Sequence, residues 1–222
     1  MHIGLIGGIG PAATVAYYTR LIEVFKNENI PLEVTIVHAN ISTLTQNSGS
    51  DRRHEQAQVF ARHIQQLKGA GCDIATITAL TGHFCFEETE QLSELPLVNA
   101  ITLIDEFCLN SKIQTLGLLG SPPVLMTKLF GLLKTPNTVV PLDGLDDLGK
   151  TYMDVAMSGI CSEANRQKFI TVGYSMIQDQ NAEAVLLAGT DLGLAFNGQS
   201  LDYKVIDALE IHVAGLAKLA SG

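Results

Sequence analysis

The fold is decided by the stretch Ile3-Gly4-Leu5-Ile6-Gly7-Gly8-Ile9-Gly10-Pro11. Its first part is a short apolar run that predicts a buried strand, and its second part is a glycine-rich turn ending in proline, which is favoured at the first position of a helix. A similar stretch, Leu116-Gly117-Leu118-Leu119-Gly120-Ser121-Pro122-Pro123, occurs in the second half of the chain. The two stretches predict two similar strand–turn–helix units, one in each half of the chain. The alternative is a chance likeness, because strand–turn–helix units of unrelated α/β proteins share such glycine patterns.

Apolar runs alternate with amphipathic stretches along the chain, which is the pattern of parallel sheets covered by helices. The expected strands are 2–6, 33–38, 73–78, 115–119, 138–141 and 184–187. The expected helices are 11–27, 51–69, 83–92, 101–110, 124–133, 148–157, 162–180 and 202–219. We therefore predict an α/β fold of two pseudo-symmetric lobes, each a parallel sheet flanked by helices. The first lobe is expected to comprise 1–110 and 201–222, and the second 111–200.

The two halves also share a second segment. Residues 74–81 are answered by residues 184–190, at a similar distance from the first strand of each half. Ligands of open parallel sheets bind at the carboxyl ends of the strands. We expect the ligand cleft between the two lobes, where both sets of strand ends would meet.

Composition excludes several classes of function. The chain has 222 residues, 46% of them hydrophobic, and a formal net charge of −9. That charge predicts no nucleic-acid partner, because such partners are bound through clustered Lys and Arg. No basic leader precedes the first strand, and no apolar run approaches the roughly 18 residues that a membrane span needs. We expect a cytoplasmic protein that does not act at a membrane.

The four cysteines are expected to be packing residues. They are Cys72, Cys85, Cys108 and Cys161, which are widely separated and form no CxxC pair. This spacing matches neither a zinc site nor a disulfide framework. The sequence therefore predicts no metal site.

The first glycine-rich turn has two interpretations. The stretch Gly8-Ile9-Gly10-Pro11-Ala12-Ala13 fits the loose dinucleotide pattern G-x-G-x-x-G/A. However, the second expected strand ends in His38-Ala39-Asn40 and lacks the acidic residue that binds a ribose, which argues against NAD. A short loop whose free N–H groups hold a small carboxylate fits better. Its candidate residues are Gly8, Gly10 and Thr14.

Two further segments carry a family resemblance. Thr78-Ala79-Leu80-Thr81-Gly82-His83 and Leu187-Ala188-Gly189-Thr190-Asp191 resemble the two active-site segments of the aspartate/glutamate racemase family, roughly Cys-Asn-Thr-Ala-His and Gly-Cys-Thr-Glu. Three more segments resemble family motifs in the expected order, namely residues 7–11, 69–73 and 207–212. The resemblance spans nearly the whole chain and implies the two-lobed racemase fold, no cofactor and a homodimer.

The resemblance also exposes a departure from the family. Its two catalytic thiols would fall at Ala79 and Gly189. In the family one thiol removes the α-proton of an amino acid and the other returns a proton from the opposite side. Neither alanine nor glycine can move a proton, and a positioned acid–base group contributes roughly 10² to 10⁴-fold to a rate. In addition, Leu80 replaces the family's Asn, and Ala156 and Met157 stand where aspartate racemases tend to carry a lysine.

The polar residues at the family's site positions are candidates for binding the ligand. Backbone N–H groups and hydroxyls at the ends of strands suit a carboxylate. These candidates are Thr81, Gly82, Ser121 and Thr190. Arg52 is the candidate for a distal carboxylate, which it would bind bidentately, and Arg53 is the alternative. Equally, the threonines would serve as turn caps and the two arginines as solvated charges at a helix start.

Two residues are candidates to replace the thiols. His83 is the first, because an imidazole titrates near neutral pH and family members often have histidine there. Asp191 is the second, because it follows the vacated Gly189 and replaces the family's Glu. A further candidate, Cys85, is better explained by a place in the interior of a helix.

Three functions are consistent with the sequence. The first is a cofactor-independent isomerase acting on a small, acidic amino acid or carboxylate, with proton transfer reassigned to His83, Asp191 or a bound water. The alternative is a catalytically inactive homologue that binds a small carboxylate. The third is a nicotinamide-dependent oxidoreductase built on the glycine-rich turn.

Overall fold

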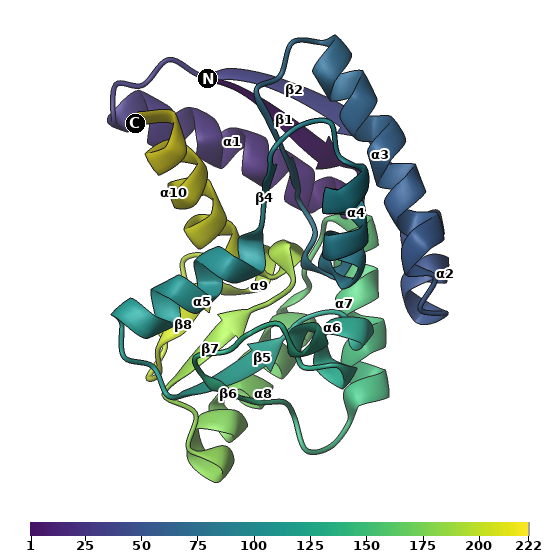
Figure 1. Cartoon of the computed structure of the whole chain (residues 1–222). Coiled ribbons are helices and arrows are strands. Elements are labelled where there is room, and N and C mark those ends of the chain that lie inside the picture. Colours follow the sequence, from purple (N-terminus) through teal and green to yellow (C-terminus); the bar gives the residue numbers. More distant parts are fainter. Residues whose placement is uncertain (222) are drawn as a thin grey trace. The chain divides into compact units, whose positions relative to one another are not determined.

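The computed structural model describes residues 1–221 and divides into two compact units. Unit 1 is Met1–Ala100 together with the C-terminal segment that begins at Leu209, and unit 2 is Ile101–Ala208. The chain passes between the units at the starts of α5 (Ala100–Asn110) and α10 (Ala208–Ser221) (Figure 1). The sequence predicts the boundaries after residues 110 and 200. These two positions fall at the end of α5 and ahead of the last strand.

Unit 1 is built on a parallel four-stranded sheet in the order β2-β1-β3-β4. Its strands are β1 (His2–Gly7), β2 (Glu33–His38), β3 (Ile74–Ile77) and β4 (Leu97–Val98). Its helices are α1 (Pro11–Asn27), α2 (Ile41–Gly49), α3 (Arg53–Gly69), the 3-10 helix η1 (Leu80–Cys85), α4 (Phe86–Leu92) and most of α10. The two central strands, β1 and β3, are almost wholly buried, as their apolar sequences require.

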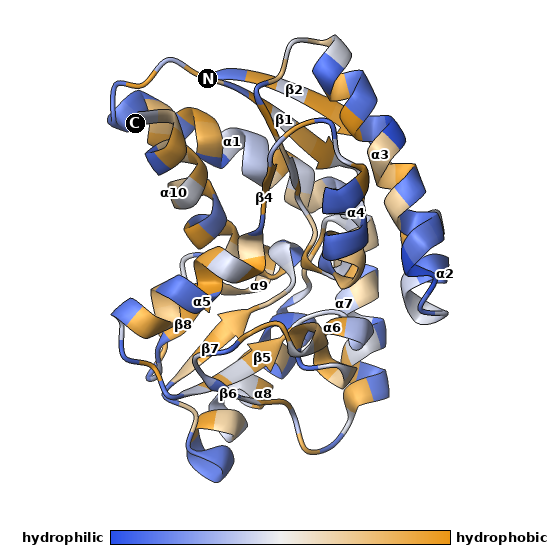
Figure 2. Ribbon diagram, in the orientation of Figure 1, coloured by the Kyte–Doolittle hydropathy of each residue, from blue (hydrophilic) through white to orange (hydrophobic). Residues whose placement is uncertain are grey.

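Helices cover both faces of the unit 1 sheet. A side chain at Gly4 would collide with Leu67 of α3, with its Cβ 2.8 Å from Leu67 Cδ1. Gly7 points to the opposite face, where a side chain would collide with Thr14 of α1. Figure 2 shows apolar residues along the strands and hydrophilic residues over α2 and α3. The small residues of β1 thus let both helices pack directly on the backbone of the central strand.

A buried histidine joins α10 to the sheet and to α1. His212 is completely buried, with Nδ1 2.7 Å from the Tyr17 hydroxyl and Nε2 2.8 Å from the Thr76 hydroxyl. Because the Thr76 hydroxyl donates to the Val98 carbonyl, it accepts from Nε2–H, and Nδ1 accepts from Tyr17. Burial lowers the pKa of His212 to about 3, with a smaller contribution from His83. The neutral imidazole therefore links three elements of unit 1.

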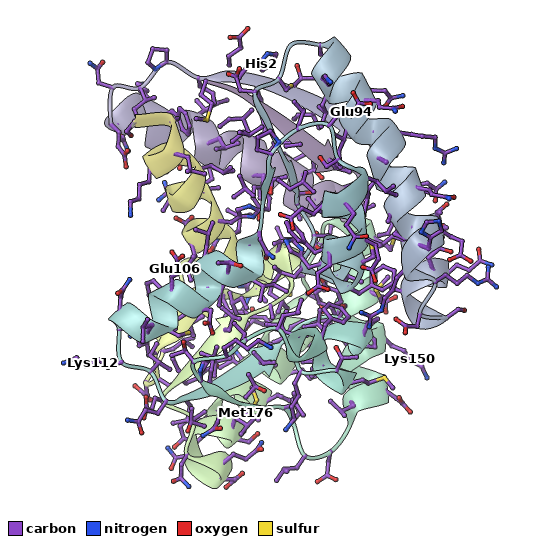
Figure 3. The ribbon with its side chains drawn as sticks, in the orientation of Figure 1. His2, Glu94, Glu106, Lys112, Lys150 and Met176 are labelled. Carbon is purple, nitrogen blue, oxygen red and sulfur yellow. The ribbon has the colours of Figure 1, made fainter. Side chains whose placement is uncertain are left out.

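Unit 2 repeats this topology with a parallel sheet in the order β6-β5-β7-β8. Its strands are β5 (Thr115–Leu119), β6 (Asn137–Val139), β7 (Ala184–Leu187) and β8 (Val205–Asp207). Its other helical elements are α6 (Pro122–Met126), η2 (Leu129–Gly131), α7 (Leu145–Ser158), α8 (Glu163–Gln180), η3 (Thr190–Leu192) and α9 (Gly193–Phe196). Met176 of α8 packs against Gly117 of β5, where an added Cβ would lie 3.2 Å from its sulfur (Figure 3).

The predicted α/β fold with two similar parallel sheets is confirmed, and four local expectations are wrong. The expected helix 202–219 contains β8 and becomes helical only at Ala208. The expected helix 124–133 stops at Met126, because the backbone is left-handed from Lys128 to Gly131. The expected helix 51–69 begins at Arg53, and α2 precedes it, with the Asn40 side chain capping its first turn. The expected helix 83–92 is η1 followed by α4.

Residues 1–221 contain neither a membrane-spanning helix nor a cluster of metal-binding side chains. Over residues 1–221, no helix is long and apolar enough to cross a membrane. In the same part of the chain, no three His, Cys, Asp or Glu side chains gather in a way that could hold a metal ion. Cys72, Cys85 and Cys108 are buried free thiols, and Cys161 is partly exposed.

Stability should depend on pH through His83 and His212. Burial lowers their folded-state pKa values to about 4 and about 3, from an ordinary value of 6.5. Because the unfolded chain binds these protons more readily than the folded protein does, acid favours unfolding. The contribution of the two neutral histidines to stability is therefore present above about pH 6.5 and is lost as the pH falls. The free energy of unfolding should drop by about 2 kcal/mol per histidine between pH 6.5 and 5.

Urea unfolding at several pH values checks this expectation. His212→Gln should be less stable than the wild type at pH 7.5 and should lose less stability on acidification. The control is His54→Gln, which changes an exposed histidine and should keep the wild-type slope. Equal slopes for all three proteins would contradict the assignment.

Candidate functional site

Ala79 and Gly189, where the resemblance places the family's two thiols, are structurally equivalent positions. Ala79 lies two residues beyond the end of β3 and immediately precedes η1, and Gly189 lies two residues beyond the end of β7 and immediately precedes η3. Their backbones are both extended, with φ −115° and ψ 127° at Ala79 and φ −130° and ψ 115° at Gly189. The same strand–turn design therefore occurs once in each unit.

The topology of each sheet makes these turns candidate sites for a ligand. In unit 1 the chain proceeds from β1 outward to β2 and from β3 outward to β4, so the order of strands reverses between β1 and β3. In unit 2 it reverses between β5 and β7. Ligands of open α/β sheets bind beyond the carboxyl ends of the strands at such a point. We call the turns after β1 and β3 the unit 1 strand-end group, and those after β5 and β7 the unit 2 strand-end group.

In the unit 1 group, the glycine-rich turn is closed by Thr14. Its hydroxyl accepts a hydrogen bond from the Gly8 N–H (2.8 Å) and donates one to the Gly10 carbonyl (3.1 Å). Gly8 has φ +81°, and a Cβ there would lie 2.5 Å from the ring of His38, so glycine is required. The Gly8 N–H is thus not free for an anion, contrary to the expectation from the sequence. Thr14 orders the turn.

His83 is held on both sides by the backbone. It is almost wholly buried, with Nδ1 3.2 Å from the Ala79 carbonyl and Nε2 accepting from the Ala100 N–H at 3.2 Å. Its ring stacks on Phe86, with the ring centroids 5.4 Å apart. Burial lowers the pKa of His83 to about 4. These contacts favour a structural role in holding η1 over the proton-transfer role expected from the sequence.

The other unit 1 candidates lie around η1. Gly82 is buried, and a Cβ there would lie 2.6 Å from Ile77 of β3, so the turn packs against its own strand. Thr81 is half-buried on this turn. The exposed Arg52 stands at the junction of α2 and α3, and both helices contact η1. Arg53 forms an exposed ion pair with Asp51 (2.8 Å), which leaves Arg52 as the better candidate for a ligand.

In the unit 2 group, an aromatic ring fills the space that a side chain at residue 189 would need. A Cβ added at Gly189 would lie 2.7 Å from Cζ and 2.8 Å from the hydroxyl oxygen of Tyr152, and closer still to Cε2. Tyr152 belongs to α7 and is 7% exposed. Its ring cannot simply swing into solvent. A cysteine at position 189 and the observed position of Tyr152 are therefore incompatible.

Tyr152 is bonded to the second proton-transfer candidate. Its hydroxyl donates to Oδ2 of Asp191 at 3.2 Å, and Asp191 is 3% exposed. Burial, followed by the nearby Asp191 charge, raises the pKa of Tyr152 well above 10. The phenol therefore stays protonated at neutral pH and serves as a donor. It cannot act as the base that a thiolate would be.

The remaining unit 2 candidates gather at the same strand ends. Ser121 immediately follows Gly120 at the end of β5, and Thr190 follows Gly189; both are almost fully buried. The two turns touch, because a Cβ at Gly120 would lie 2.8 Å from the Ala188 carbonyl. The structure thus groups Ser121, Thr190 and Asp191 within unit 2, and Gly8, Thr14, Thr81 and Gly82 within unit 1.

Tyr152 is the site residue that the sequence analysis missed. The resemblance drew attention to residues 152–159 only because a family lysine is absent at Ala156 and Met157. Tyr152 lies one helical turn before Ala156, so both fall on one side of α7. The tyrosine one helical turn from Ala156 could have indicated that this side of α7 belongs to the site. Nothing in the sequence indicated that its ring meets Gly189.

Comparison with known proteins identifies relatives across the whole chain. The model of the Asp/Glu/hydantoin racemase family matches residues 6–216. Among curated protein sequences, no match was found.

Solved racemase structures have the same fold. An aspartate racemase homologue from Pyrococcus horikoshii OT3 aligns over 100% of this chain and 99% of its own, with 24% identity and a TM-score of 0.81. An aspartate racemase from Picrophilus torridus aligns over 100% and 95%, with 22% identity and a TM-score of 0.76. Glutamate racemase from Francisella tularensis, in complex with D-glutamate, aligns over 98% and 80%, with 16% identity and a TM-score of 0.67. At these identities the likeness shows the fold.

The clash at position 189 gives a direct test of the unit 2 geometry. Gly189→Cys should lower the free energy of unfolding by about 1–3 kcal/mol, because the Tyr152 ring must move in a packed interior. Tyr152→Ala should remove the added cost, so the two changes should be strongly non-additive. The equivalent change in unit 1, Ala79→Cys, extends a side chain that already has a Cβ and should cost less. Urea unfolding of the wild type, the three single variants and the double variant of residues 152 and 189 measures these costs, and additive effects at 152 and 189 would refute the contact.

Proposed function

The chain belongs to the Asp/Glu/hydantoin racemase family, and we propose that it binds a small carboxylate ligand, acidic amino acids being the first candidates, without racemising it through paired thiols. One observation carries the proposal. The equivalent positions that would hold the thiols are Ala79 and Gly189, and the side-chain space at the second is filled by Tyr152. Two-sided proton transfer through thiols therefore has no groups to perform it.

Three titratable residues near the strand ends, His83, Tyr152 and Cys85, are poorly suited to replace a thiolate. His83 has both ring nitrogens engaged by backbone groups and a depressed pKa. Tyr152 has a pKa raised well above 10. Of the four cysteines, Cys85 lies nearest in sequence to Ala79, but burial raises the pKa of its thiol to about 12. Each of these groups stays in its neutral form near pH 7 and does not offer a ready base.

Groups that bind a carboxylate are retained. Thr81 and Thr190 lie in the turns after β3 and β7, and Ser121 follows β5. Arg52 carries a charge at the edge of unit 1 beside η1. In our proposal these residues bind the ligand, Arg52 through a bidentate contact with a distal carboxylate. The proposal includes no cofactor, a cytoplasmic location and a homodimer.

A second candidate function is supported by the bond between Tyr152 and Asp191. A phenol and a carboxylate, both buried, lie beside the vacated position 189. Such a pair could perform one-sided proton transfer, with Asp191 as the base and Tyr152 holding its orientation. The protein would then be a cofactor-independent isomerase of a different mechanism. Any exchange of a substrate α-proton should in that case disappear in Asp191→Asn and weaken in Tyr152→Phe. It should survive in His83→Ala, because His83 has a structural role.

Binding and its charge preference test the proposal. In saturation-transfer NMR, aspartate or glutamate should give a signal that a fully amidated analogue does not. Arg52→Ala should weaken binding of the dicarboxylate by about tenfold, because a charge-assisted bidentate contact is worth roughly 1.5–3 kcal/mol and this one is exposed. Binding of alanine, which lacks a distal carboxylate, should not change.

The matched control for this test is Arg62→Ala. Arg62 is an exposed arginine on the same helix, nearly three turns beyond Arg52, and its loss should leave affinity unchanged. Equal losses in the two variants would indicate a general charge effect. The absence of saturation transfer for every carboxylate tried would refute the proposed function.

A further inference from the structure

A pocket of about 330 Å³ lies in unit 2 between α8 and the segment 199–203, which leads into β8 (Figure 1). Its lining on the α8 side follows the spacing of one helix face and consists of Gln167, Ile170, Thr171 and Tyr174. On the other side, Tyr203 stands two residues before β8, whereas the unit 2 strand-end group follows the carboxyl ends of β5 and β7. Among the described residues, the two share no member. The pocket is therefore separate from the candidate functional site.

The ring of Tyr203 is a fixed wall of this pocket. Its hydroxyl donates a hydrogen bond to the Ile170 carbonyl at 2.9 Å. Gly173 of α8 leaves room for the ring, because a Cβ there would collide with the hydroxyl oxygen and lie 3.0 Å from Cζ of Tyr203. Glycine is unfavourable inside a helix, so its presence here fits the need to admit the ring. Burial raises the pKa of Tyr203 to about 12, and the ring stays uncharged near pH 7.

Tyr174 provides a second aromatic wall. It follows Gly173 on α8 and is 47% exposed. The ring centroids of Tyr174 and Tyr203 are 6.3 Å apart, and the ring planes are inclined at 53°. We call this pair of inclined rings the aromatic corner. A cation placed in the corner can lie within about 6 Å of both centroids, the range over which the face of an aromatic ring attracts a positive charge.

The charge of the pocket is negative. Among the described residues that line it, Asp202 is the only one with a charged side chain, and within residues 1–221 that carboxylate forms no ion pair. The two basic residues in the first half of α8 are paired elsewhere, Arg166 with Glu163 and Lys168 with Asp147. The Asp202 carboxylate is thus left to solvent and to whatever occupies the pocket.

We propose that this pocket binds a small organic ammonium ion, with the positive charge in the aromatic corner and Asp202 as its counter-ion. Gln199 and Ser200 also line the pocket and offer oxygen acceptors for N–H or O–H groups of the ligand. The volume is at the lower end of the range for ligand pockets, roughly 300–1,000 Å³, and suits a small molecule. The formal net charge of −9 on the chain attracts cations in general.

The carboxylate favours a cation over other ligands. An anion would be repelled by Asp202. A neutral, hydroxyl-rich ligand could bond to Gln199 and Ser200, but it would remove water from the Asp202 charge without giving that charge a partner. An ammonium ion satisfies the carboxylate and the two rings together.

Saturation-transfer NMR with choline and ethanolamine tests the proposal, because these probes carry a quaternary and a primary ammonium group on the same short chain. At least one should bind saturably, and the uncharged isostere of choline, in which carbon replaces the nitrogen, should not. Tyr174→Leu should weaken binding about fivefold, whereas Tyr174→Phe keeps the aromatic face and should bind as the wild type does. Asp202→Asn should weaken binding about threefold, because this carboxylate is exposed.

The matched control is Asp179→Asn. Asp179 is an exposed aspartate near the end of α8, and its loss changes the net charge equally without touching the pocket. An excess of aspartate should not displace the ammonium probe, which separates this pocket from the proposed carboxylate site. Three results would overturn the proposal: no saturable binding of either probe, equal binding of the uncharged isostere, or an affinity that Tyr174→Leu and Asp202→Asn leave unchanged.

Discussion

The ring of Tyr152 lies where any side chain at residue 189 would have to go, and this exclusion governs the chemistry open to unit 2. The ring is buried and its hydroxyl is bonded to Asp191, so it is held from both ends. The strand-end turn after β7 consequently keeps its backbone shape while losing the position from which a thiol would act. The glycine at 189 and the tyrosine at 152 therefore depend on each other.

The two units show how one topology can be kept while its strand ends diverge. Both sheets have the same strand order, and both turn from strand to 3-10 helix at the same relative residue. In unit 1 the turn is fixed by His83, whose nitrogens bridge Ala79 and Ala100, and the position of the thiol holds alanine. In unit 2 it is fixed beside the Tyr152–Asp191 bond. The buried polar side chains His83, Tyr152 and Asp191 are thus hydrogen-bonded within the fold, as buried polar groups generally are.

Much of this could be predicted from sequence because the decisive signals are local. Apolar runs flanked by glycine and proline gave all six expected strands, and the order of motifs gave the family. The missed strands, β4 and β8, have two and three residues and are set by pairing with β3 and β7. The helix expected through 124–133 failed because Leu129 and Phe130 adopt positive φ, which no propensity predicts for such side chains. The role of Tyr152 depends on contact between residues far apart in the chain, which one sequence cannot show.

The measurement that bears most directly on this account is proton NMR of D- and L-aspartate and glutamate in D₂O with the purified wild-type protein. The account predicts that the α-proton signal of every enantiomer persists at the uncatalysed rate, while the same samples give saturation transfer from protein to ligand. Loss of an α-proton signal, with appearance of the opposite enantiomer, would contradict it and would show that a group other than a thiol transfers the proton.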